Sequence, residues 1–113
     1  MRRVVVESPY SAPTPEGVQT HVEYARACLR DCIRRGEAPI ASHLLLTQPG
    51  VLDDADPEER ETGMRAGWAW IPTATAVVVY TDYGVSSGME RGVECARRWD
   101  VPVEYRTLPK EAP

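Results

Sequence analysis

The sequence has no long apolar run and no block of basic residues. No run approaches the roughly 20 residues of a membrane-spanning helix, and the apolar run after Arg3 stops at Glu7, too early for a secretory signal. The formal net charge is −4, which disfavours the backbone of a nucleic acid as a partner. We therefore expect a cytoplasmic protein that binds neither a membrane nor a nucleic-acid polymer.

Cysteines are few and the common cofactor motifs are missing. Cys28, Cys32 and Cys95 are an odd number without disulfide spacing, which indicates buried thiols in a reducing compartment. Cysteine and histidine are too scarce at ligand spacing to form a zinc site. No G-x-G-x-x-G, P-loop lysine or H-E-x-x-H motif occurs. The sequence therefore predicts neither a metal nor a cofactor.

Short β-branched runs alternate with helical patterns along the chain. In order, we expect a strand at 4–6, a helix at 15–35, an apolar run at 39–46 taken as the second strand, a helix at 57–70, a strand at 76–80, a helix after 88 and a strand at 101–108. This order predicts an α/β fold, a small flavodoxin-like or Rossmann-like three-layer sandwich with a four-stranded parallel sheet. The first and third strands should be adjacent. Residues 1–108 should form a single α/β domain, followed by a C-terminal tail at 109–113.

Ligands of such sheets bind outside the carboxyl ends of the strands, where the strand order reverses. This rule selects Ser8–Tyr10 and Asp82–Glu90. Ser86, Ser87 and Gly88 stand where a helix begins, and its free N–H groups can bind a phosphate or carboxylate. A plain helix cap would use the same serines.

Each remaining candidate also has a purely structural explanation. Glu90 and Glu94 could face the crevice, but an acid in the first helical turn also offsets the helix dipole. Asp82 could be functional or could bond turn amides. Tyr10 could reach the crevice or pack within its loop. His43, expected near the end of the second strand, could instead be a core histidine.

Three tryptophans, Trp68, Trp70 and Trp99, are expected in the core or at a subunit interface. A chain of 113 residues buries a limited share of its surface. We therefore expect a homodimer or a larger homo-oligomer.

Two segments resemble the nucleoside 2-deoxyribosyltransferase-like superfamily. Val4-Val5-Val6-Glu7-Ser8-Pro9-Tyr10 is similar to its opening strand and substrate loop. Val77–Asp82, followed by Gly88-Met89-Glu90-Arg91-Gly92, is similar to its later strand, acidic turn and helix start. The chain resembles more closely a short bacterial and phage branch with SPY near the start and D-x-G-x-S-x-G-M-x-x-G-x-E-x-A later. In that pattern the recurring acid falls on Glu94 and not on Glu90.

The resemblance implies that Glu90 or Glu94 attacks the anomeric carbon of a nucleoside or nucleotide, with Asp82 handling the base and Tyr10 positioning the nucleophile. The expected substrate-binding residues are Ser8, Pro9, His43, Ser86, Ser87, Gly88 and Met89. The serines and the helix end would hold a 5′-phosphate. The implied activity is that of an N-glycosidase or a 2-deoxyribosyltransferase. A non-catalytic nucleotide-binding or sequestering module, or an interaction protein that reuses the fold, remains an alternative.

Overall fold

The computed structural model describes residues 1–110 of the chain. It contains a sheet of four parallel strands in the order β2–β1–β3–β4. The strands are β1 (Arg2–Glu7), β2 (Glu37–Ile40), β3 (Ala76–Tyr80) and β4 (Val103–Arg106). The predicted α/β fold with adjacent first and third strands is confirmed. Residues 111–113 of the predicted tail lie outside the described part of the chain.

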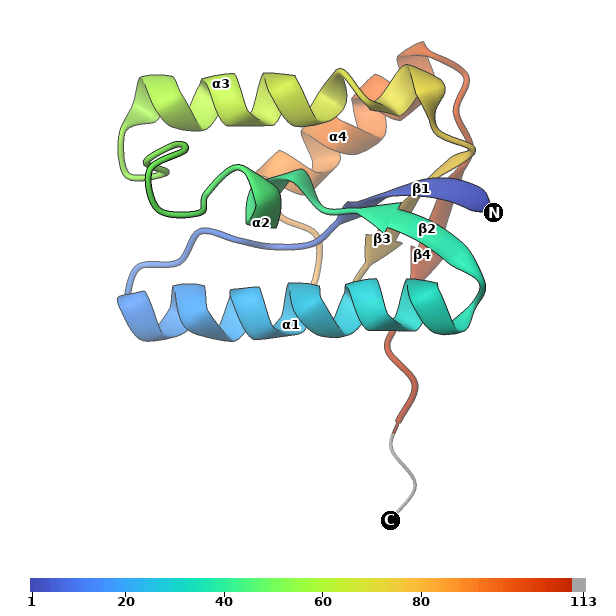
Figure 1. Ribbon diagram of the computed structural model, residues 1–113, viewed down its shortest axis with the longest axis horizontal. Coiled ribbons are helices and arrows are strands. Elements are labelled where there is room, and N and C mark those ends of the chain that lie inside the picture. Colours follow the sequence, from blue (N-terminus) through green and yellow to red (C-terminus); the bar gives the residue numbers. More distant parts are fainter. Residues whose placement is uncertain (111–113) are drawn as a thin grey trace.

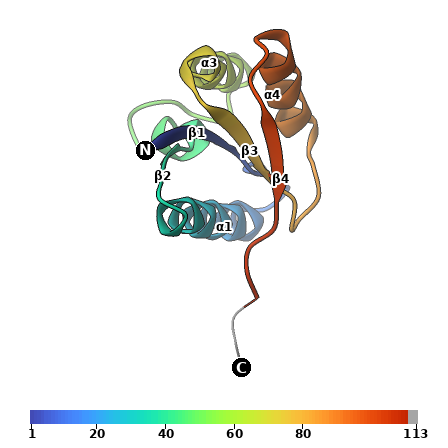
Figure 2. The ribbon, with the colours of Figure 1, turned by 90° about the vertical axis from the view of Figure 1, so that its right-hand side faces the viewer.

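Helices cover both faces of the sheet (Figures 1 and 2). Helix α1 (Pro15–Arg34) lies on one face, whereas α3 (Pro57–Trp68) and α4 (Ser87–Arg98) lie on the other. Thr14 caps α1 by accepting a hydrogen bond from the Gly17 N–H. Within residues 1–110, no helix is both long and apolar enough to cross a membrane.

The core divides into two clusters, one on each face of the sheet. Val4 and Val6 of β1 pack with α1, while Val5 packs with the buried side chains of α4. Successive side chains of a strand point to opposite faces. Glu7, two residues after Val5, is therefore directed toward the face covered by α4. This placement brings a carboxyl group into the interior at the end of β1.

The apolar run at 39–46 is not a continuous strand, which corrects the prediction. Strand β2 ends at Ile40, and a short helix, α2 (Ser42–Leu45), follows. The N–H groups of Leu44 and Leu45 both donate to the carbonyl of Ala41, which turns the chain away from the sheet. His43 therefore lies on α2 and not at the end of a strand.

The three cysteines are free thiols. Cys28 and Cys32 are buried on the face of α1 that packs on the sheet, as predicted, whereas Cys95 of α4 is half-buried. Burial raises the pKa of the Cys28 thiol to about 12, so this thiol stays protonated at neutral pH. Cys28 is accordingly a core residue and not a nucleophile.

Candidate functional site

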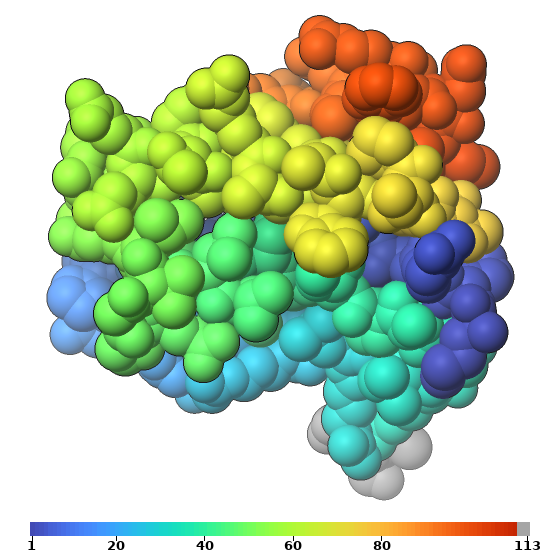
Figure 3. Space-filling view, turned by 45° about the horizontal axis from the view of Figure 1, so that its top comes forward, coloured from blue at the N-terminus to red at the C-terminus, as the bar shows by residue number. Residues whose placement is uncertain are grey.

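A cavity of about 100 Å³ lies beyond the carboxyl ends of β1 and β3, with walls from α2, α3 and the start of α4. The order of strands reverses between β1 and β3, so the cavity lies at the carboxyl edge of the sheet where the sequence predicts a binding site. The loop between α2 and α3, together with α3 itself, forms the outer surface on this side of the molecule (Figure 3). The cavity is therefore bounded by segments that are distant in sequence.

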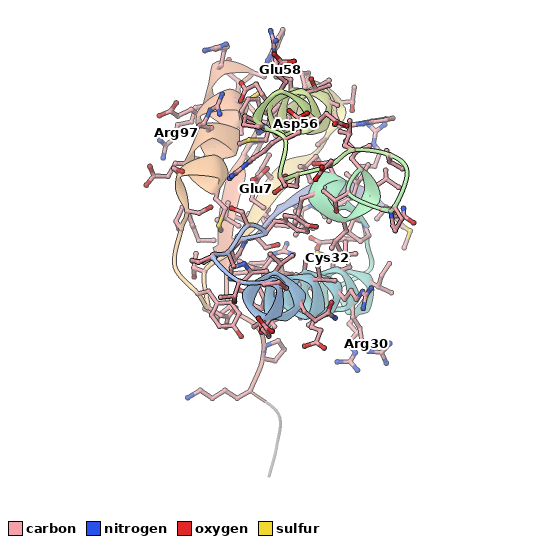
Figure 4. The ribbon with its side chains drawn as sticks, turned by 90° about the vertical axis from the view of Figure 1, so that its left-hand side faces the viewer. Glu7, Arg30, Cys32, Asp56, Glu58 and Arg97 are labelled. Carbon is pink, nitrogen blue, oxygen red and sulfur yellow. The ribbon has the colours of Figure 1, made fainter. Side chains whose placement is uncertain are left out.

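Glu7 places its carboxyl group in this cavity. The residue lies in the interior between α4 and α2 (Figure 4). Among residues 1–110 every fully buried side-chain oxygen has a hydrogen-bond partner. The Glu7 carboxyl has no hydrogen-bond partner, so its oxygens are not fully buried and open into the cavity that Glu7 lines. Burial raises the pKa of this carboxyl from 4.5 to about 8. Glu7 is therefore mostly protonated at pH 7.

Ser8 and His43 form a second polar group in the cavity. The Oγ atom of the buried Ser8 and Nε2 of His43 are hydrogen-bonded at 2.9 Å. Burial lowers the pKa of His43 to about 4, so its imidazole is neutral at pH 7. The ring of Tyr10 packs edge-on against this imidazole, with 6.1 Å between centroids. His21 bonds the carbonyl of Tyr10 at 2.9 Å and so anchors the loop that carries it.

Charged side chains line the mouth of the cavity. Asp54 comes from the loop before α3, and Glu59 and Arg60 come from the first turns of that helix. Arg60 donates to the Oγ atom of Ser11 at 3.1 Å. Sequence reasoning missed Glu7, Asp54, Glu59 and Arg60 as candidates. For Glu7 the available signal was a carboxyl directly after a buried run of valines.

Several predicted residues do meet at the cavity. Of the predicted substrate-binding set, its lining includes Ser8, His43, Ser86, Gly88 and Met89, and it also includes Tyr10. Ser86 also caps α4 by accepting a hydrogen bond from the Met89 N–H at 3.3 Å. Pro9 is buried outside the lining, and Ser87 borders a neighbouring shallow pocket.

Glu90 and Glu94 do not reach the cavity. Helix α4 buries Met89, Gly92 and Val93 against the sheet, and this orientation leaves both glutamates exposed to solvent. Glu90 and Glu94 therefore do not face the crevice, which corrects the expectation that one of them acts there.

Asp82 also lies away from the cavity. Its carboxylate accepts hydrogen bonds from the Tyr24 hydroxyl at 2.5 Å and from the Leu108 N–H at 3.1 Å. It borders a separate shallow groove beside residues 107–110. Asp82 thus joins α1, the turn after β3 and the segment after β4, which is a structural arrangement.

Residues 2–106 match the model of a protein family described as a domain of unknown function (DUF7768). The chain belongs to this family. Its fold is shared with the solved structure of a 2-deoxyribosyltransferase from the psychrotolerant bacterium Bacillus psychrosaccharolyticus, with a TM-score of 0.62 and 18% sequence identity. That likeness covers 98% of this chain and 76% of the other. No curated protein matches the sequence.

The tryptophans of this DUF7768 chain have different environments. Trp68 lines the cavity, and the guanidinium of Arg91 lies 4.7 Å from its ring centroid. Trp70 and Trp99 are 56% and 57% exposed, so neither is a core residue. Their expected place at a subunit interface stays a prediction. Within residues 1–110 of the DUF7768 chain, no cluster of three or more His, Cys, Asp or Glu side chains could hold a metal ion.

Proposed function

We propose that this chain cleaves the bond between base and sugar in a nucleoside or nucleotide, and passes the sugar to water or to a second base. The observation that carries this proposal is the unpartnered carboxyl of Glu7 in the cavity. The fold shared with a 2-deoxyribosyltransferase supports it. Cleavage of such a bond builds positive charge on the sugar, and a nearby carboxyl group can stabilise that charge. We therefore assign the catalytic carboxyl to Glu7 and not to Glu90 or Glu94.

The protonation state of Glu7 suits the departure of the base. In the proposed step the bond from the anomeric carbon to the base nitrogen breaks, and the Glu7 proton moves to the base. The resulting Glu7 carboxylate stabilises the cationic sugar and then accepts a proton from the attacking water or second base. Ser8 and the neutral His43 supply hydrogen-bond donors and acceptors for the sugar hydroxyls.

The dimensions of the cavity indicate which part of the substrate is enclosed. Its volume of about 100 Å³ is below the roughly 300–1,000 Å³ of typical small-molecule sites. A pentose fits the enclosed part, and the remaining groups would lie at the open mouth. Arg60 and Gly88 line both the cavity and the neighbouring shallow pocket that Ser87 borders, so this part of the surface would favour a 5′-phosphate.

A second candidate function is non-catalytic binding or sequestration of a nucleotide. It is favoured by the position of Glu90, Glu94 and Asp82, because these three acidic residues, to which the resemblance assigns attack and base handling, lie outside the cavity. The cavity and its mouth would then serve recognition alone.

The deciding experiment measures free base after incubation of the protein with a panel of nucleosides and nucleoside 5′-monophosphates. We expect release by the native chain and a loss of at least about 100-fold in Glu7→Gln. The double variant Glu90→Gln/Glu94→Gln is the matched control, because it changes the same chemical group at exposed positions, and it should retain activity. Thermal stabilisation by a nucleotide without turnover would instead support the binding module. If no member of the panel releases base or stabilises the protein, both proposals are contradicted.

A further inference from the structure

Gly92 is a buried glycine in the middle of α4 that faces the sheet. An ideal Cβ at this position would lie 2.6 Å from both Cδ and Oε2 of Glu7, and 2.9 Å from Oε1. Atoms do not approach this closely without a shift. The Glu7 carboxyl therefore occupies the space that a side chain at residue 92 would need.

The backbone of α4 does not itself require glycine at this position. Positive φ angles among the described glycines occur at Gly36, Gly50 and Gly84, and Gly92 is not one of them. A glycine inside a helix is destabilising relative to alanine. The structural reason for Gly92 is thus the carboxyl packed against it.

We propose that Gly92 is a positioning residue, whose missing side chain forms the recess that holds the Glu7 carboxyl in the cavity. The Glu7 carboxyl, which comes from β1, then fills the space that a side chain at position 92 of α4 would occupy. The resemblance implies that the attacking glutamate is Glu90 or Glu94 of this helix. In the structure both of these side chains face solvent. The catalytic meaning of Gly92 rests on the proposed function, but the recess itself can be tested without turnover.

The other groups around the cavity leave the carboxyl without a charged partner. The titratable and charged groups that face Glu7 are His43 of α2, Tyr10 after β1, Asp54, Glu59 and Arg60 at the mouth, and Cys95 one turn further along α4. His43 is neutral, and none of these groups forms a hydrogen bond or ion pair with Glu7 among residues 1–110. The depth of the recess therefore decides how the carboxyl titrates.

The first test adds one methyl group with Gly92→Ala and follows Glu7 by side-chain carboxyl ¹³C NMR. We expect the displaced carboxyl to become more solvated, so its titration should move from pH about 8 toward the ordinary 4.5. The matched control is Gly63→Ala on α3, where the added methyl meets only the Leu52 side chain at 3.1 Å. A Glu7 titration that is unchanged in Gly92→Ala would overturn the proposal.

The second test moves the carboxyl from the strand to the helix. Glu7→Ala should abolish base release, and adding Gly92→Asp to that variant should restore it by about 10-fold or more. No recovery in a folded double variant would count against Gly92 as a catalytic position. If the native chain releases no base while the Glu7 titration still moves in Gly92→Ala, the proposed function fails and the recess stands.

A control covers the case in which Gly92→Ala does not fold. Removing the carboxyl as well, in Glu7→Ala/Gly92→Ala, relieves the collision and should restore folding, as followed by circular dichroism. A double variant that also remains unfolded would show that the glycine serves the helix and not Glu7, which contradicts the proposal.

Discussion

The carboxyl of Glu7 lies against the α-carbon of Gly92, so that Oε2 is 2.6 Å from the point that a Cβ of residue 92 would occupy. This contact joins the end of β1 to the middle of α4. A half-buried, desolvated carboxyl without a partner is unfavourable for stability. Groups of this kind, with a perturbed pKa in a cavity, occur preferentially at functional sites.

The first prediction concerns the pH dependence of stability. The pKa of Glu7 in the folded state is about 8 and its ordinary value is 4.5. Between these values the folded state binds more protons than the unfolded state, so the free energy of unfolding falls as pH rises. Glu7→Gln should match the native chain below pH about 4.5 and exceed it by on the order of 2–4 kcal/mol at pH 8. Urea unfolding at several pH values measures this, and a constant difference would refute it.

The second prediction concerns the pH dependence of the proposed reaction. If Glu7 gives its proton to the departing base, kcat/KM should fall above pH about 8. The rate of base release between pH 5 and pH 10, on one substrate from the panel, provides the measurement. A rate that rises through pH 8 would instead assign Glu7 the role of an ionised nucleophile.

The third prediction concerns the buried ion pair between Arg106 and Glu37. Two guanidinium nitrogens of Arg106 each donate to a different Glu37 oxygen at 2.7 Å, and the pair holds the pKa of Glu37 below its usual value. Glu37→Gln leaves the buried Arg106 with a weaker partner and should lower the free energy of unfolding by about 3 kcal/mol. Glu61→Gln is the matched control, because its pair with Arg91 is exposed to solvent and should therefore contribute far less to stability. Equal losses in the two variants would be contrary to this assignment.

The fourth prediction separates a structural from a catalytic role for Asp82. Removing its bonds to Tyr24 and Leu108 with Asp82→Ala should lower the free energy of unfolding by about 1–3 kcal/mol. Tyr24→Phe removes the same hydrogen bond between Tyr24 and Asp82. The losses in the free energy of unfolding caused by the two variants should therefore be less than additive in a double-mutant cycle. Base release by folded Asp82→Ala should stay within about 2-fold of the native rate, since Asp82 is remote from the cavity. A far larger loss of activity at full stability would return Asp82 to the catalytic set.

The fold class, the parallel sheet and the end of the sheet at which the cavity lies could all be predicted from local sequence patterns. These follow from local properties, because β-branched runs favour strands and apolar spacing of three to four favours helices. The predicted strand at 39–46 is wrong beyond Ile40, because short apolar runs do not distinguish a strand from a helix and α2 is only four residues long.

Which carboxyl enters the cavity depends on how the strands and helices pack together. The run Val4-Val5-Val6 is apolar on both faces, so the sequence could not show that Val5 and Glu7 point toward α4. The rotation of α4 about its axis, set by packing Met89 and Val93 on the sheet, turned Glu90 outward. A recess at Gly92 exists only once strand and helix are packed together, because it is formed by residues 85 positions apart in the chain.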